Sequence, residues 1–130
     1  MIESQRLQDS VLLFLPLCPS TNARMGVVRM GGFCRQILTK EARDYISSVG
    51  TPLAWWKKAS RFPTLDNYFA LDLWYVLPRI NCDASNYGKV LFDALEEGGI
   101  VSNDKYILPR VRGIWHDKQT VAVVKLPWRK

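Results

Sequence analysis

The sequence predicts a small α+β domain, and three observations support this prediction. The chain has 130 residues, which is the usual length of a single domain. Four segments have the apolar or alternating pattern of β-strands, and two others have apolar residues at helical spacing. Hydrophobic residues make up 48% of the chain and charged residues 23%, a balance typical of a folded globular protein rather than a disordered one.

The N-terminal half contains one predicted strand and one predicted helix. Residues 1–10 are polar and can form a loose arm, whereas residues 11–17 form an apolar run that predicts a buried strand. Residues 23–38 combine glycines with arginines, which indicates a flexible basic loop with room for a short hairpin. Thr39 is a good N-cap for a helix, and Gly50-Thr51-Pro52 either ends that helix or lets it resume through Trp55 and Trp56. Both tryptophans cannot face inward on one helix, so we expect one to be exposed.

The C-terminal half contains the clearest elements. Residues 68–77 alternate as in a central strand, and residues 86–97 form the best helix of the chain, which Gly98-Gly99 ends. A strand over residues 106–115 follows. Asp117-Lys118-Gln119 then predicts a hairpin turn to a return strand over residues 120–126.

The charge of the chain favours a polyanionic partner. The formal net charge is +6 and the isoelectric point about 9.4, which suits nucleic acid or an anionic membrane surface. A basic enzyme with no such partner is the alternative.

Several function classes lack the residues they need. The three cysteines are too irregularly spaced for a disulfide framework or a zinc site, which favours a reducing cytosol. His116 is the single histidine, so the chain has few residues from which to build a Ser/His or Cys/His catalytic pair. We find neither a signal peptide nor an apolar stretch of about 20 residues, and therefore expect a soluble intracellular protein without a membrane partner.

A cluster of polar side chains surrounds the best helix. Around its start and first turns stand Asp83, Ser85, Asn86, Lys89 and Asp93. Asn103 and Asp104 follow beyond Gly98-Gly99, where the chain can bring Asp104 back towards Asp83. Converging oxygen ligands of this kind bind Mg²⁺ or Mn²⁺, and such a metal can support phosphodiester hydrolysis with Lys89 neutralising the phosphate.

The same residues also have a purely structural interpretation. Ser85 or Asp83 can cap the helix, Lys89 and Asp93 can form a solvated pair at (i, i+4) spacing, and Asn103-Asp104 can form a turn. Spacing alone does not decide between the two interpretations.

The order of these motifs resembles the RusA family of Holliday junction resolvases. The resemblance rests on Asp83-x-Ser85-Asn86-x-x-Lys89, on Asp93-Ala94-Leu95 in the same helix, and on Asn103-Asp104 downstream. The turn Pro19-Ser20-Thr21-Asn22 and the helix after Thr39 agree more faintly with the family's N-terminal half.

The resemblance implies a fold, an activity and roles for named residues. The implied fold is a small mixed β-sheet with helices packed on one face, in a homodimer. The implied activity is Mg²⁺-dependent cleavage of four-way DNA junctions, with Mn²⁺ as a substitute, in the cytoplasm or nucleoid of a bacterial host, by a protein common in phages and prophages. Asp83 and Asp104 match the metal-binding aspartates, Lys89 matches the catalytic lysine, and Asn86 and Asp93 match supporting positions.

Two positions depart from the family pattern. Ser85 and Asn103 stand where aspartates are typical, so each keeps an oxygen as a metal ligand but loses a charge. A weaker metal site is expected, and a junction-binding protein of the same fold with little or no cleavage is the alternative function.

Basic residues along the chain are candidates for contacts to DNA phosphates, which position a protein without reading sequence. The candidates are Arg24, Arg29, Arg35, Lys57, Lys58, Arg61, Arg79, Arg110 and Arg112. For about half of them, a role in surface solubility alone is the alternative.

Overall fold

The computed structural model describes residues 2–20, 25–30, 33–80, 84 and 87–129. In this part of the chain, five strands form one mixed sheet in the order β1-β2-β7-β5-β6, and two more form a separate hairpin. The sheet strands are β1 (Glu3–Arg6), β2 (Ser10–Leu15), β5 (Phe69–Leu77), β6 (Ile107–His116) and β7 (Val121–Pro127). The remaining elements are the hairpin strands β3 (Met25–Met30) and β4 (Phe33–Leu38), the helices α1 (Lys40–Ser60) and α2 (Lys89–Glu97), and the short 3₁₀ helix η3 (Asp104–Tyr106).

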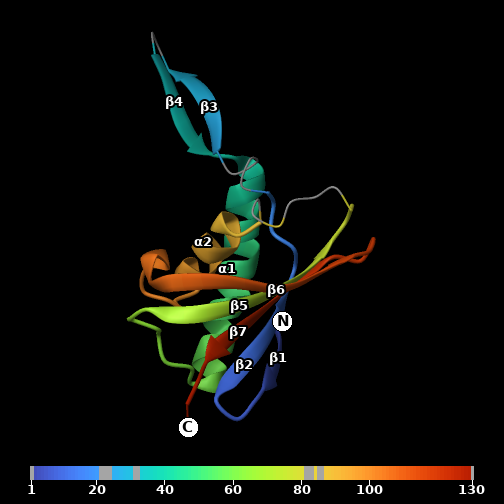
Figure 1. Cartoon of the computed structure of the whole chain (residues 1–130). Helices are drawn as coiled ribbons and strands as arrows, with labels where there is room; N and C mark the ends of the chain where they lie inside the picture. The colour runs from blue at the N-terminus through green and yellow to red at the C-terminus, as the bar shows by residue number, and fades with distance from the viewer. Residues whose placement is uncertain (1, 21–24, 31–32, 81–83, 85–86, 130) are drawn as a thin grey trace.

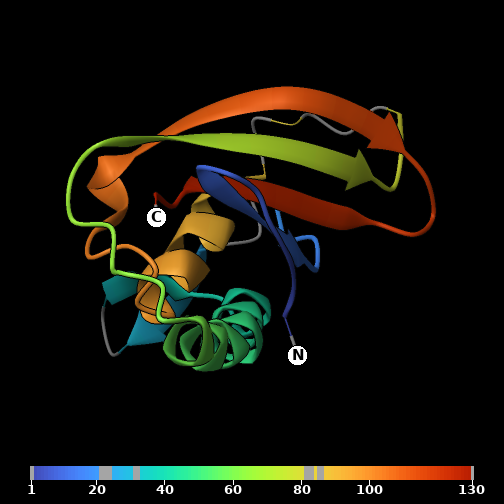
Figure 2. The same cartoon turned by 90° about the horizontal axis from the view of Figure 1, so that it is seen from below.

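Both helices lie on the same face of the sheet, as Figure 1 and Figure 2 show from two directions. Alternate residues of β2, β5 and β7 are buried beneath them, which gives each strand a period of two. The predicted α+β class and the packing of helices on one face of a small mixed sheet are confirmed.

The hydrophobic core fills the space between this face and the helices. It combines Leu13 of β2, Leu73 of β5 and Val124 of β7 with the apolar stripe of α2, which includes Leu91 and Leu95. All five side chains are at most 1% exposed, so the core anchors α2 firmly against the sheet.

The link from β5 through α2 to β6 determines where the candidate site lies. β5 and β6 are parallel, and parallel neighbours need a long crossover connection, which α2 supplies. The residues at the start of α2 and those just before β6 therefore come together on the helical face of the sheet.

The predicted hairpin of β6 and β7 is wrong. Both strands exist where the sequence indicates, but they pair with opposite sides of β5, which lies between them. The short connection passes the end of β5, where the Asp117 amide donates to the Leu77 carbonyl over 3.0 Å. β7 thereby becomes the central strand of the sheet, between β2 and β5.

The first ten residues also differ from the predicted loose arm. Glu3–Arg6 form β1, which pairs antiparallel with β2. The Arg6 guanidinium donates to the carbonyl of Ser10 over 2.9 Å and to that of Trp128 over 2.6 Å, and it stacks 4.0 Å from the Trp128 ring. These contacts tie the N-terminal strand to the other end of the chain.

The basic segment after β2 forms the hairpin of β3 and β4, in register from Met25 opposite Leu38. In Figure 1 this hairpin extends away from the sheet beyond the start of α1. The predicted loop thus contains the short hairpin for which the sequence left room.

Helix α1 begins as predicted and runs through Pro52. The Thr39 hydroxyl accepts from the Ala42 amide over 3.2 Å, and the helix ends at Arg61 in the left-handed conformation. Trp55 is 69% exposed while Trp56 packs partly against the core, so the expected division between the two tryptophans is confirmed. Among the described residues, neither α1 nor any other helix is long and apolar enough to cross a bilayer.

Candidate functional site

Helix α2 starts at Lys89, three residues later than the sequence indicates. Its N-cap is Gly88, which has no side chain with which to cap the helix. Just before it, the Tyr87 amide donates to the Ala84 carbonyl over 3.0 Å, and the Tyr87 carbonyl accepts from the hydroxyl of buried Tyr75. These bonds hold the chain in a turn at Tyr87, so that helical geometry begins only after Gly88.

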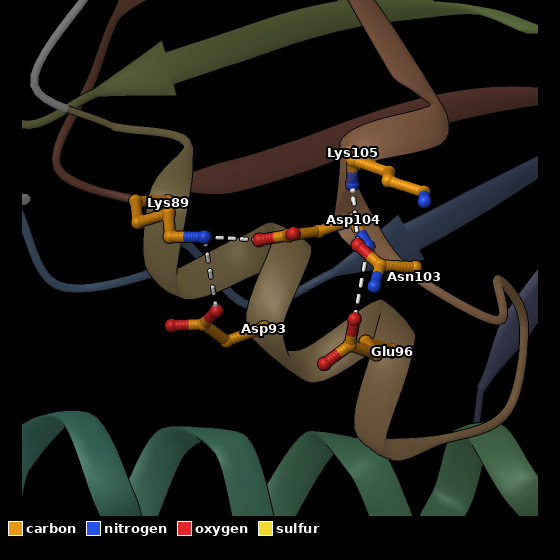
Figure 3. Close-up of polar contacts among 6 residues, drawn as sticks. All are labelled: Lys89, Asp93, Glu96, Asn103, Asp104 and Lys105. Atoms are coloured by element: carbon orange, nitrogen blue, oxygen red, sulfur yellow. Dashed lines mark hydrogen bonds and ion pairs between the residues drawn. The ribbon is translucent and has the colours of Figure 1, made fainter. Parts of the chain in front are cut away.

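Lys89 lies between two carboxylates. Its ammonium forms an ion pair with Asp104 and lies 3.6 Å from an oxygen of Asp93, one turn further along α2. Figure 3 shows the three side chains converging from α2 and η3. The Lys89 side chain is 41% exposed, against 16% for Asp93 and 23% for Asp104, so the cluster is partly buried but open to solvent.

Two glycines and a hydrogen bond between Ser102 and Leu65 bring Asp104 back to α2. The chain reverses at Gly98 and at Gly99, whose φ of +76° favours glycine. The Ser102 amide then donates to the Leu65 carbonyl over 3.0 Å, which fixes the approach to η3. Asp104 therefore returns to the start of α2, where Lys89 is its partner; Asp83, towards which the sequence predicted this return, lies outside the described residues.

Asn103 has a structural role in this arrangement. Its side-chain oxygen accepts from the Lys105 amide over 2.9 Å and so caps η3. Of the two predicted roles for Asn103, metal ligand and turn residue, the structure therefore shows the second.

Glu96 is a member of this site that the sequence analysis missed. Its carboxylate accepts from the Asp104 amide over 2.9 Å (Figure 3) and so holds the backbone of Asp104 in place. The signal was present, because Lys89, Asp93 and Glu96 follow at four- and three-residue spacing on one helical face.

An apolar hollow of about 320 Å³ adjoins the cluster. Lys89 lines its edge, Tyr87 and Phe92 line one side, and Pro109 and Val111 of β6 line the other. The charged groups thus lie beside a mainly apolar surface.

Only some of the predicted metal ligands lie among the described residues. Asp83, Ser85 and Asn86 lie outside the described residues. Within those residues, no three His, Cys, Asp or Glu side chains are grouped so as to hold a metal. Mg²⁺ needs only one or two carboxylates when water and phosphate complete its shell, so Asp104 fits one carboxylate position of such a site.

The other aspartates near the sheet are engaged elsewhere. The Asp72 carboxylate accepts from Arg110 over 2.7 Å, and Asp66 accepts from the Ser102 hydroxyl over 2.7 Å. Neither belongs to the cluster around Lys89.

The predicted DNA-contact residues fall into separate groups. Lys57, Lys58 and Arg61 lie at the end of α1, where the Lys58 ammonium is 6.0 Å from the centre of the exposed Trp55 ring. Arg79 and Arg112 are exposed, whereas Arg110 is paired with Asp72. Arg29 lies on β3 and Arg35 on β4, and Arg24 lies outside the described residues.

No protein-family model matches this chain, and no curated protein matches it either.

Proposed function

We propose that the protein is an Mg²⁺-dependent endodeoxyribonuclease that resolves four-way DNA junctions as a homodimer, in DNA recombination and repair in the cytoplasm of a bacterial host. The observation that supports this proposal best is the cluster of Lys89, Asp93 and Asp104. This cluster contains Lys89 and Asp104, which are two of the three residues that match catalytic positions in the RusA resemblance.

Each residue of the cluster has a chemical role in this proposal. Asp104, with Asp83, would hold the metal, and a bound Mg²⁺ would polarise the phosphodiester and activate a water. The Lys89 ammonium would neutralise charge that develops on the phosphate. Asp93 keeps that ammonium oriented, and Glu96 fixes the Asp104 backbone.

The net charge supports a nucleic-acid substrate. A net charge of +6 draws a polyanion to the protein, and contacts to phosphates make such binding weaken with salt. Two sites in a symmetric dimer would match two strands of a two-fold symmetric junction.

A cleavage assay tests the proposal. An end-labelled four-way junction and a linear duplex of the same sequence are incubated with Mg²⁺ or Mn²⁺ and with the wild-type protein, Asp83→Asn or Lys89→Gln. We expect paired, metal-dependent nicks in the junction alone, and their loss in both variants. Lys105→Gln is the matched control, because Lys105 is an exposed lysine in η3 outside the ion cluster and should leave cleavage unchanged. Junction binding without nicks in either metal would refute the enzymatic proposal.

A second candidate function is binding of DNA junctions with weak or no cleavage. The role of Asn103 as a cap favours it, because that side-chain oxygen is already occupied where the family pattern has a carboxylate. The same assay decides: tight, salt-dependent junction binding without products supports this alternative, whereas nicks sensitive to Asp83→Asn exclude it.

A further inference from the structure

Trp55 of α1 stands between two hollows on the protein surface. The larger hollow has a volume of about 500 Å³ and the smaller about 270 Å³, and Trp55 lines both. Its side chain is nevertheless 69% exposed. A solitary exposed aromatic residue needs no special explanation, but one that forms the wall of an apolar hollow is typical of a binding surface.

The larger hollow is apolar and has a rigid wall. It is lined by Ile2, Thr51, Pro52, Trp55, Trp56 and Ala59. The Trp56 ring packs against Phe62 and Trp128, with ring centres 5.3 Å and 6.0 Å away. The Trp56 indole N–H also donates to the Ser4 hydroxyl over 3.1 Å, which ties β1 to α1 where Figure 2 shows the start of the chain beside that helix. The hollow is therefore formed before any ligand binds.

Cations lie on the other side of Trp55. An α-helix has about 3.6 residues per turn, so Lys58 and Arg61 follow Trp55 on the side of α1 away from Pro52 and Ala59. The Lys58 ammonium is 6.0 Å from the centre of the Trp55 ring, and Lys58 lines the smaller hollow. Trp55 thus separates an apolar hollow from a basic stretch of α1.

These cations are not neutralised by the protein itself. Among the described residues, no ion pair involves Lys57, Lys58 or Arg61. Of the described residues that line the two hollows, Glu97 alone carries a carboxylate. Three cations against this one carboxylate leave a local net charge of +2. The surface therefore favours a ligand that is both apolar and negatively charged.

This surface is separate from the ion cluster of the candidate site. Lys89 is the first residue of α2 and Glu97 the last, so about 12 Å of helix lies between them. A ligand that covers Trp55 and Lys58 does not need to contact the Lys89–Asp104 pair.

We propose that the Trp55 surface, which comprises the larger hollow and the cations Lys57, Lys58 and Arg61, binds an acidic peptide segment of a partner protein. Apolar side chains of the peptide enter the hollow and cover Trp55, since buried tryptophans contribute strongly to such interfaces. Its carboxylates lie beside the cations, which steer the encounter and select an acidic sequence. The inference does not rest on the proposed nuclease activity.

The apolar lining favours a peptide over a nucleic-acid strand. Bases bind such surfaces by stacking on aromatic faces, and successive bases need successive rings. Trp55 is exposed, but Trp56 is packed against other rings, and Ile2, Pro52 and Ala59 are aliphatic. Leucine or phenylalanine side chains match this lining better than bases do.

Fluorescence anisotropy of the full chain with a labelled probe tests the inference. The probe is a short fluorescein-labelled peptide in which aspartates alternate with leucine and phenylalanine. We expect saturable binding, weakened at least roughly 30-fold by Trp55→Ala and about tenfold by Lys58→Glu. The matched controls are Trp115→Ala and Lys118→Glu, which make the same changes at an exposed tryptophan and an exposed lysine elsewhere and should bind like the wild type.

Two comparison peptides need no change in the protein. One replaces the apolar residues of the probe with serine and the other replaces its aspartates with lysine, and both should bind at least roughly 30-fold more weakly. No saturable binding of the acidic probe, or equal binding of the serine peptide, would overturn the proposal. Displacement of the probe by a single-stranded oligonucleotide or by phosphatidylserine vesicles at lower concentrations than by unlabelled peptide would also overturn it. Binding of the probe by a protein that cuts no DNA would support this inference and refute only the nuclease.

Discussion

The ammonium of Lys89, the first residue of α2, pairs with the carboxylate of Asp104 from the far side of the Gly98-Gly99 reversal. This pair joins the two ends of the crossover between β5 and β6. It also places the Lys89 ammonium in direct contact with the carboxylate that we propose as a metal ligand.

Asp104→Asn should abolish cleavage while leaving junction binding intact. It removes a proposed metal ligand and the partner of Lys89, and we expect the cleavage rate to fall at least about 100-fold. Stability should fall by no more than about 1 kcal/mol because the pair is partly exposed. Single-turnover cleavage and a mobility-shift assay measure the two effects. Asp44→Asn, which breaks the exposed Lys40–Asp44 pair, is the control; an equal loss of cleavage in both variants would contradict the assignment.

Arg110→Ala should not change the salt dependence of DNA binding. The Arg110 guanidinium is held by Asp72 over 2.7 Å, on the face of the sheet opposite the helices. Each phosphate contact contributes close to one unit to the slope of log affinity against log salt. Titration of a labelled junction at several salt concentrations measures that slope. A fall of about one in Arg110→Ala would show that this arginine contacts DNA after all.

Gly98→Ala should destabilise the protein by about 1–3 kcal/mol. A β-carbon at Gly98 would lie 2.6 Å from the Leu53 β-carbon and 3.1 Å from the Gly50 carbonyl oxygen, so the contact between α1 and α2 would have to open. Urea denaturation measures the free energy of unfolding. Thr51→Ala, at an exposed position of α1, should change it by less than about 0.5 kcal/mol. A Gly98→Ala protein as stable as that control would rule out this close approach.

Stability should decrease as the pH rises from 9 to 11. Burial raises the pKa of the Cys18 thiol from 9.0 to about 11, so over this range the unfolded state binds fewer protons than the folded state. The free energy of unfolding then falls with rising pH, by at most about 2–3 kcal/mol from this group. Burial also raises the pKa of Tyr45 and of Tyr75, which adds to the loss above pH 10.

Urea denaturation at a series of pH values, on the wild type and on Cys18→Ala, isolates the contribution of the thiol. The decrease between pH 9 and 10 should be smaller in the variant. If both proteins lose the same stability over that interval, Cys18 is not the group responsible.

Local patterns in the sequence predicted most of the elements but not how all of them pair. The alternation in β5 and the apolar stripe of α2 predict their own burial, because each depends on neighbours along the chain. The partner of β7 depends on competition between strands far apart in sequence. A short polar turn favours a hairpin with β6, yet β5 pairs with both strands and separates them.

The candidate site shows the same division. The spacing of Lys89 and Asp93 predicts their contact. The sequence predicted that Asp104 returns towards Asp83, and the structure brings Asp104 to Lys89 at the start of α2. Spacing could not decide whether the Asn103 oxygen would cap η3 or face the cluster, because both need the same residue at the same position. The start of α2 was predicted too early because the turn at Tyr87 depends on Tyr75, a residue of another strand.

The central position of β7 has a consequence for how the protein is made. During synthesis, β1 and β2 leave the ribosome early and β5 and β6 much later, but residues 121–127 must emerge before the two pairs can join. Until then each pair exposes a strand edge whose backbone N–H and C=O groups have no partner strand, and such edges promote aggregation. A nascent chain stalled before Val121 would therefore hold two half-sheets, and we expect it to depend on chaperones until β7 closes them into one.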